Sequence, residues 1–376
     1  MVRAEAGQTA ADLKKQKALL EEEQEETTRR LLHVRERILS RALLKEHQTV
    51  PFHALDHALK EQDVSHAYLF TGPKGSLKKE LAVLYAQSLL VGSTTGLVQE
   101  DQLSEEDQRI CINAAEGIDP DFLILDGRKK EAVSKDAVDQ IQLRFASTAS
   151  GKTGTKIYLI DHAENMSVSA MNSLLKYLEE PGPNVLAVLT ADNIERLLPT
   201  IISRCVNLQF NSMPESVYQK LADAEGLDRE DSFLISRAVR MTVGFQEFAA
   251  SESFQTAKSM LKEFIGAEGD CRQFLVDYDT RWRIRDKDAV SSARDRNLDT
   301  LKLFFAMLSG FYHDTALNDD SGPAWYYKEV QNAQKRKTDC GKRIRIAVEA
   351  MDRCNRNNDL NLVLDQAIYR MENTAE

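Results

Sequence analysis

The stretch "FTGPKGSLKKEL", residues 70–81, decides how the fold is interpreted. It follows the short apolar run "HAYLF" and precedes "AVLYAQSLLV", in which apolar residues recur at helical spacing. A glycine turn between a strand and a helix is typical of a phosphate-binding loop, G-x-x-x-x-G-K-[ST]. Gly72 begins this pattern and Lys78 takes its lysine position. Leu77, however, stands in place of the second glycine, and Lys79 in place of the hydroxyl residue.

These two replacements weaken both functions of the loop. The motif uses glycine at the position of Leu77 because the backbone there must approach phosphate with torsions that a Cβ disfavours. Adopting such a torsion costs other residues about 1–2 kcal/mol. The hydroxyl at the position of Lys79 normally binds Mg²⁺, which an ammonium group would repel. Lys78 and Lys79 could still attract an anion, so weak phosphate binding stays open. We predict no cofactor and no productive Mg·ATP binding at this degenerate loop, which comprises Gly72, Gly75, Leu77, Lys78 and Lys79.

A second acidic motif, "KIYLIDHAE" (residues 156–164), leads to the same prediction. Asp161 ends an apolar run, where P-loop folds place an aspartate that coordinates the metal. Hydrolysis normally also needs a neighbouring carboxylate to orient water, and that position is His162. A neutral imidazole could in principle act as a base. We expect Glu164 to point elsewhere if the strand ends at Asp161.

The chain changes character along its length. From about Thr49 to Phe210, apolar runs such as "DFLILDG" and "NVLAVLTAD" alternate with helical patterns, which predicts a parallel sheet covered by helices on both faces. After Phe210 the strand signals largely vanish. The predicted fold class is therefore α/β plus all-α. We expect a charged helical extension over 1–46, a parallel-sheet domain over 47–210, a small helical lid over 211–252 and a helical collar over 253–376.

Composition restricts the possible environments of the protein. No apolar run approaches the roughly 20 residues that span a bilayer, and the N-terminus lacks the apolar core of a signal peptide. We therefore predict a cytoplasmic protein with no membrane partner. The five cysteines show no CxxC pair and predict free thiols rather than a disulfide framework. With a net charge of −10, the chain is not expected to grip DNA phosphates by itself.

Three stretches occur together in a characteristic order: "SHAYLFTGPKG", "KIYLIDHAENMSVSAMNSLLKYLEEPGPN" and "ERLLPTIISRC". In order and spacing they resemble the clamp-loader branch of the AAA+ ATPases, and within it the delta-prime family of bacterial DNA polymerase III. The resemblance covers residues 49–210 and extends more weakly into the C-terminal helices. It implies a RecA-like AAA+ domain with a degenerate P-loop, a helical lid domain and a collar through which subunits oligomerise.

Many members of that family carry a zinc module whose last cysteine opens the run C-x-x-[apolar]-x-x-G-x-H-P-D. The corresponding run is "CINAAEGIDPD", with Cys111 at the cysteine position and Asp119 in place of the histidine. Gln108 and Glu105 stand where further ligands are expected, and no other cysteine precedes Cys111. A structural zinc ion needs four good ligands. We therefore predict no metal here.

The resemblance also assigns Ser203, Arg204 and Cys205 to a motif at the boundary between subunits, whose arginine reaches into the neighbour's ATP site. A guanidinium group offers paired donors to the charge on a transferring phosphoryl group, and such arginine fingers are worth about 10³–10⁵ in rate in related enzymes. From the residues alone, Arg204 could equally be an ordinary surface ion-pair partner.

The resemblance implies a non-catalytic, delta-prime-like subunit that supplies Arg204 in trans and helps load the sliding clamp during DNA replication. Such a subunit is not an ATPase by itself but is part of the DNA polymerase III holoenzyme. Its implied partners are the gamma/tau motor and delta subunits, the sliding clamp indirectly, and primer-template DNA through the assembled complex. Two alternatives stay open: an active AAA+ ATPase, either gamma/tau-like or recombination-linked, and a free-standing scaffold that recruits partners through the N-terminal helix. Leu77, Lys79 and His162 argue against the active ATPase.

Overall fold

The computed structural model divides into two compact units, one up to Met213 and one from Pro214 onwards. It describes residues 41–99, 102–128, 133–145, 151–266, 271–285, 290–354 and 358–373. The predicted extension over 1–46 lies outside the described residues except for its last part, where residues 41–47 are helical. Among the residues that the structure describes, no helix combines the length and the apolar character needed to cross a bilayer.

The first unit is built on a parallel sheet of five strands in the order β2-β3-β4-β1-β5. The strands are β1 (Ala67–Thr71), β2 (Phe122–Asp126), β3 (Lys156–Asp161), β4 (Val185–Ala191) and β5 (Val206–Gln209). The sequences of β1, β3 and β4 are almost wholly apolar because these central strands are buried on both faces. This strand order in a parallel sheet is that of the RecA-like AAA+ core, so the predicted α/β part of the fold is confirmed.

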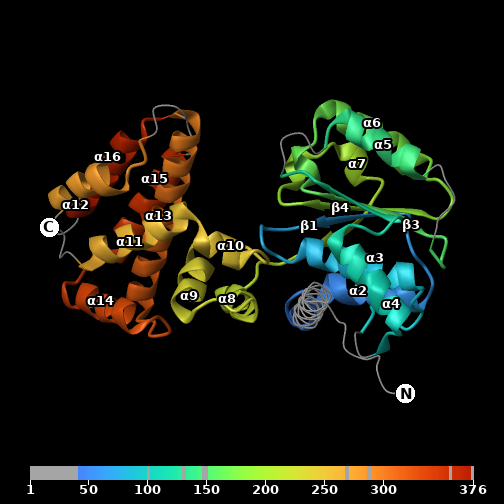
Figure 1. Cartoon of the computed structure of the whole chain (residues 1–376), viewed down its shortest axis with the longest axis horizontal. Coiled ribbons are helices and arrows are strands. Elements are labelled where there is room, and N and C mark those ends of the chain that lie inside the picture. The colour runs from blue at the N-terminus through green and yellow to red at the C-terminus, as the bar shows by residue number, and fades with distance from the viewer. Residues whose placement is uncertain are drawn as a thin grey trace, which may run out of the picture. The chain divides into compact units, whose positions relative to one another are not determined.

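Helices cover both faces of this sheet (Figure 1). One face carries α2 (Thr49–Lys60), α3 (Lys78–Val91) and α4 (Glu105–Glu116). The other carries α5 (Lys135–Phe145), α6 (Val168–Glu179) and α7 (Pro199–Ile202). Leu69, Ile160 and Leu189 from the three central strands are fully buried with Leu174 of α6 in one apolar core. This core fixes the carboxyl ends of β1, β3 and β4 side by side, at the edge where open α/β sheets bind ligands.

The second unit is helical, which confirms the all-α part of the predicted class; its described residues contain no strand. Its helices are α8 (Glu215–Ala224), α9 (Arg229–Ala238), α10 (Phe245–Ala250), α11 (Glu252–Gly266), α12 (Cys271–Asp277), α13 (Val290–Leu317), α14 (Ala324–Lys335), α15 (Cys340–Cys354) and α16 (Leu360–Glu372), with a π-helical turn over Tyr278–Trp282. The predicted lid corresponds to α8–α10 and the predicted collar to α11–α16. Both parts lie within the same compact unit, and the division near residue 252 stays a prediction.

A buried ion-pair network joins α8 and α9 to α13 and to the segment that follows it. Nε of Arg237, on α9, lies 3.1 Å from Oδ2 of Asp314, on α13, and its Nη2 lies 2.7 Å from Oδ2 of Asp319. Glu215 of α8 also pairs with this guanidinium group, and the hydroxyl of Tyr326 donates to Asp314 at 2.9 Å. Burial raises the pKa of Asp314 and outweighs the opposing charge of Arg237. The network therefore depends on Arg237 to compensate a carboxylate that is almost inaccessible to solvent.

We expect Arg237→Met to destabilise the second unit by about 3–5 kcal/mol, because it leaves the buried Asp314 without its cation. Both tryptophans of the chain, Trp282 and Trp325, lie in this unit, so urea unfolding followed by tryptophan fluorescence measures the loss. Arg370→Met is the matched control, since Arg370 pairs with Glu349 at the surface and such pairs contribute roughly 0–1 kcal/mol. Equal effects of the two substitutions would contradict the role of the network.

Candidate functional site

The glycine turn between β1 and α3 has a backbone that requires glycine at one position and takes a left-handed torsion at another. A Cβ added to Gly72 would lie 2.6 Å from the carbonyl oxygen of Phe210, so only glycine fits where the loop passes the end of β5. Gly75 has a φ of 75°, in the left-handed region. The two glycines therefore preserve the turn that the sequence pattern predicts.

Leu77 adopts the torsion that glycine provides in the motif. Its φ is 63° and its ψ is 28°, and it caps the first turn of α3 without a side-chain hydrogen bond. The left-handed torsion costs a leucine about 1–2 kcal/mol. The side chain is only 1% exposed, and burying a leucine contributes roughly 1.5–3 kcal/mol. Burial thus offsets the strain, and the loop keeps its shape although the glycine is gone.

Lys78 folds back into the loop that it follows. Its ammonium group donates to the carbonyl oxygens of Gly72 at 2.9 Å and Pro73 at 2.8 Å, and Oγ of Ser76 lies 3.1 Å away. It also pairs with Oδ1 of Asp192 at 2.8 Å, and its side chain is only 7% exposed. An ammonium group has three hydrogens, so these four acceptors already satisfy it. A phosphate group would have to displace these partners.

Lys79 faces the aspartate at the end of β3. Its Nζ lies 3.7 Å from Oδ2 of the buried Asp161, whose Oδ1 accepts a hydrogen bond from Oγ1 of Thr190 at 2.6 Å. In a working P-loop enzyme the residues at positions 79 and 161 would share Mg²⁺. The structure thus brings residues 79 and 161 together. The positive charge beside Asp161 is the ammonium group of Lys79.

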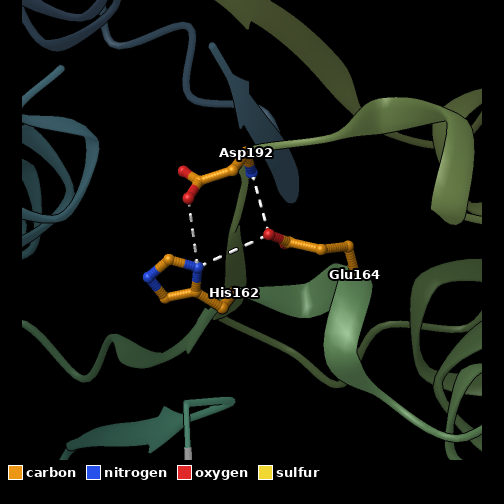
Figure 2. Close-up of side chains that lie close together, drawn as sticks. All are labelled: His162, Glu164 and Asp192. Carbon is orange, nitrogen blue, oxygen red and sulfur yellow. Dashed lines mark hydrogen bonds and ion pairs between the residues drawn. The ribbon is translucent and has the colours of Figure 1, made fainter. Parts of the chain in front are cut away.

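His162, Glu164 and Asp192 form a second cluster beside these lysines (Figure 2). His162 follows β3 in the left-handed conformation, with a φ of 54°. Its Nδ1 lies 3.4 Å from Oε1 of Glu164 and 3.6 Å from Oδ2 of Asp192. Oε1 of Glu164 also accepts a hydrogen bond from the backbone amide of Asp192 at 3.1 Å.

The expectation that Glu164 points elsewhere is wrong. The strand does end at Asp161, but His162 then takes positive φ and the chain enters a 3₁₀ turn over Ala163–Asn165. This turn carries Glu164 back over the end of β4, where its side chain is buried against His162 and Asp192. The imidazole of His162 therefore lies close to two carboxylates, those of Glu164 and Asp192.

The carboxylates change how the imidazole titrates. The hydrogen bond to Glu164 raises the pKa of His162, and the charges of Asp161 and Asp192 add to this effect against the opposing effect of burial. Burial raises the pKa of Glu164, but hydrogen bonds from His162 and from the amide of Asp192 outweigh it and leave that pKa lowered. The two carboxylates therefore make the imidazole of His162 more readily protonated than a free one.

Asp192 and Thr190 were missed by the sequence analysis. Thr190 lies near the end of β4 and Asp192 directly follows it, and this strand end lies beside the ends of β1 and β3. Polar residues that follow a buried parallel strand converge at the same edge of the sheet, so the run "VLTAD" carried the signal. What the sequence could not give is that Asp192 turns one carboxylate oxygen to Lys78 and the other to His162.

Arg204 lies directly after α7 and is held by its own chain. Its Nη1 donates to the carbonyl oxygen of Thr200 at 2.9 Å, and its Nη2 lies 2.6 Å from Oε1 of Glu179, at the end of α6. The side chain is 34% exposed. Ser203 donates to the same carbonyl at 3.1 Å, and burial raises the pKa of the neighbouring Cys205 to about 12. The structure thus places Arg204 in a surface ion pair within this chain.

The region around Cys111 is packed without a cysteine cluster among the described residues. Cys111 is buried in α4 against Val91 and Val98, and its carbonyl accepts a hydrogen bond from Gln87 at 2.7 Å. Oδ1 of Asp119 accepts from the amide of Asp121 at 2.9 Å. Within the part of the chain that the structure describes, the group of His162, Glu164 and Asp192 is the one that could converge on an ion.

Comparison with known proteins relates the first unit to replication proteins. Residues 47–214 match the family described as "DNA polymerase III, delta subunit". The delta' subunit of Bacillus subtilis is 33% identical over 207 residues, which cover 49% of this chain and 60% of that protein. The delta' subunit of Pseudomonas aeruginosa is 37% identical over 146 residues, which cover 38% of this chain and 42% of that protein.

A tau subunit and a solved structure match a larger share of the chain. The tau subunit of Bacillus subtilis is 30% identical over 225 residues, covering 57% of this chain and 36% of that protein. This chain therefore spans less than two thirds of the length of these curated relatives. A gamma subunit-related protein from Thermotoga maritima has a TM-score of 0.41 at 16% identity, covering 86% of this chain and 99% of that one.

We expect Leu77→Gly to destabilise the first unit by about 1–2 kcal/mol, because lost burial outweighs the relief of the left-handed torsion. Leu77→Ala is the matched variant; it loses the contacts beyond Cβ but keeps the torsional cost, so it should be less stable than Leu77→Gly by about 1 kcal/mol. Hydrogen exchange of the β1 and α3 amides measures both. A Leu77→Gly variant more stable than the natural protein would contradict this account.

Proposed function

We propose that this chain, whose residues 47–214 match the family described as "DNA polymerase III, delta subunit", is a delta-prime-like clamp-loader subunit that does not hydrolyse ATP. It lends Arg204 to the ATP site of a neighbouring motor subunit and helps to load the sliding clamp during DNA replication. Its partners are the gamma/tau and delta subunits of the DNA polymerase III holoenzyme. It meets the clamp and primer-template DNA through the assembled complex.

The observation that carries this proposal is the double occupation of the nucleotide site by lysines. The ammonium group of Lys78 is bound by the loop carbonyls and Asp192. That of Lys79 lies against Asp161 in place of the metal. Phosphate would have to displace the acceptors of the first group, and Mg²⁺ would have to displace the second group itself. An active motor subunit needs its loop lysine available to phosphate and its metal position open, so the geometry does not favour the ATPase alternative, despite the similarity to tau.

The environment of Arg204 supports its use by a neighbour. An ion pair between partly exposed side chains, such as Arg204 with Glu179, contributes roughly 0–1 kcal/mol and is readily exchanged. The developing charge on a transferring phosphoryl group, shielded from water between subunits, is a stronger partner for a guanidinium group. Arg204 can therefore pair with Glu179 in the isolated subunit and bind the neighbour's phosphoryl group in the assembly.

A direct test measures the binding of ATP with Mg²⁺ to the full chain by isothermal titration calorimetry. We expect no binding tighter than about 1 mM, a weak affinity by any standard. Lys79→Thr restores the hydroxyl and removes the tethered cation, so it should bind Mg·ATP more tightly than the natural protein. A low-micromolar dissociation constant for the natural protein would refute the proposal.

The arginine finger is tested in a reconstituted clamp loader with its motor and delta subunits. We expect Arg204→Ala to slow hydrolysis at the adjoining ATP site by about 10³-fold, measured as clamp- and DNA-stimulated phosphate release. Arg196→Ala is the matched control, because Arg196 is an exposed arginine in the same connection between β4 and β5. Unchanged turnover in an assembled, folded Arg204→Ala complex would refute this role.

A further inference from the structure

His162, Glu164 and Asp192 converge at the carboxyl ends of β3 and β4 with the spacing of metal ligands (Figure 2). One ligand atom from each residue lies within 4.8 Å of the others. The Nδ1–Oε1 and Nδ1–Oδ2 distances are 3.4 Å and 3.6 Å. Two ligand atoms bound tetrahedrally to one Zn²⁺ at about 2.1 Å are separated by about 3.4 Å. Small side-chain movements would therefore bring these atoms onto a common ion.

Glu164 supplies an independent reason to expect a cation. The residue is only 6% exposed. Its Oε1 faces the imidazole and the amide of Asp192, while its Oε2 is buried without a hydrogen-bond partner among the described residues. A buried carboxylate oxygen that lacks a partner is costly. A cation bound at this carboxylate would compensate both oxygens, because the negative charge is shared between them.

Other groups hold the three side chains in place. Lys78 fixes one oxygen of Asp192 and leaves Oδ2 turned towards His162. The backbone amide of His162 donates to Oγ1 of Thr190 at 3.0 Å, which orients the residue at the strand end. Such outer contacts orient metal ligands and tune their affinity. The positive charge of Lys78 also reduces the net negative charge of the three-residue cluster. Charge alone therefore does not make this site bind every divalent cation strongly.

We propose that His162, Glu164 and Asp192 bind one divalent transition-metal ion of the zinc class, without nucleotide. One imidazole nitrogen and two carboxylate oxygens suit Zn²⁺ or Co²⁺, with water in a fourth position. Mg²⁺ prefers an all-oxygen octahedral shell and is a poor match. The site is distinct from that of nucleotide-bound magnesium, which would lie between residues 79 and 161. It goes beyond the proposed clamp-loader function and does not depend on it.

The test titrates the metal-free full chain with Co²⁺ and Zn²⁺, following visible absorption for Co²⁺ and heat for Zn²⁺. We expect one ion per chain and a Co²⁺ spectrum without thiolate charge-transfer bands, since no cysteine takes part. His162→Ala should weaken binding by at least about 100-fold, because even outer-shell changes cost 10–100-fold. His57→Ala is the matched control, because His57 forms an exposed pair with Glu61 at 3.7 Å and should leave binding unchanged.

Asp192→Asn and Glu164→Gln should each weaken binding as well, with circular dichroism to verify that they fold. His162 is the decisive position, because its side chain is 19% exposed and alanine there removes a ligand without opening the core. No saturable binding, a thiolate spectrum, or full affinity in a folded His162→Ala protein would overturn the proposal. Excess Mg²⁺ should not displace Zn²⁺, and displacement would also count against it. Failure here would leave the ATP and Arg204 tests unaffected.

Discussion

Three carboxylates gathered at one edge of the sheet are the constraint on which the first unit depends. Asp161, Glu164 and Asp192 lie at or just beyond the ends of β3 and β4 and are largely withdrawn from solvent. Buried charges persist only when they are paired. An ATPase pairs such an edge with magnesium and, through it, with nucleotide. In this chain Lys78, Lys79 and His162 provide positive charge at this edge without nucleotide.

Leu77 shows that the backbone conformation of this loop and its ability to bind phosphate depend on different features. The left-handed torsion before α3 is set by the connection between β1 and the helix, and by the close approach of Gly72 to Phe210. A leucine can occupy that torsion because its side chain enters the core. The shape of the loop is thus preserved by packing, whereas its capacity for phosphate depends on side chains that packing does not require.

The strands and helices of the first unit could be predicted because central parallel strands must be apolar on both faces, as "AYLFT", "KIYLID" and "VLAVLTA" are. The residues of the P-loop pattern could also be placed, since their spacing is local. The turn of Glu164 towards Asp192 could not, because it depends on the positive φ of His162. The pairing of Arg204 with Glu179 likewise joins the turn after α7 to the end of α6, and the relative position of these two segments follows only from the assembled core.

Lys78 and Arg204 differ in how much stabilising interaction each would lose by exchanging its present partners for a phosphate group. Lys78 has its hydrogens satisfied inside the protein, so moving it to a phosphate would leave buried carbonyls and Asp192 without their donor. Arg204 holds a half-exposed glutamate that water can solvate when the arginine leaves. Exchanging partners therefore costs considerable free energy at Lys78 and almost none at Arg204. That asymmetry is the physical reason to expect this chain to act on a neighbour's nucleotide and not on one of its own.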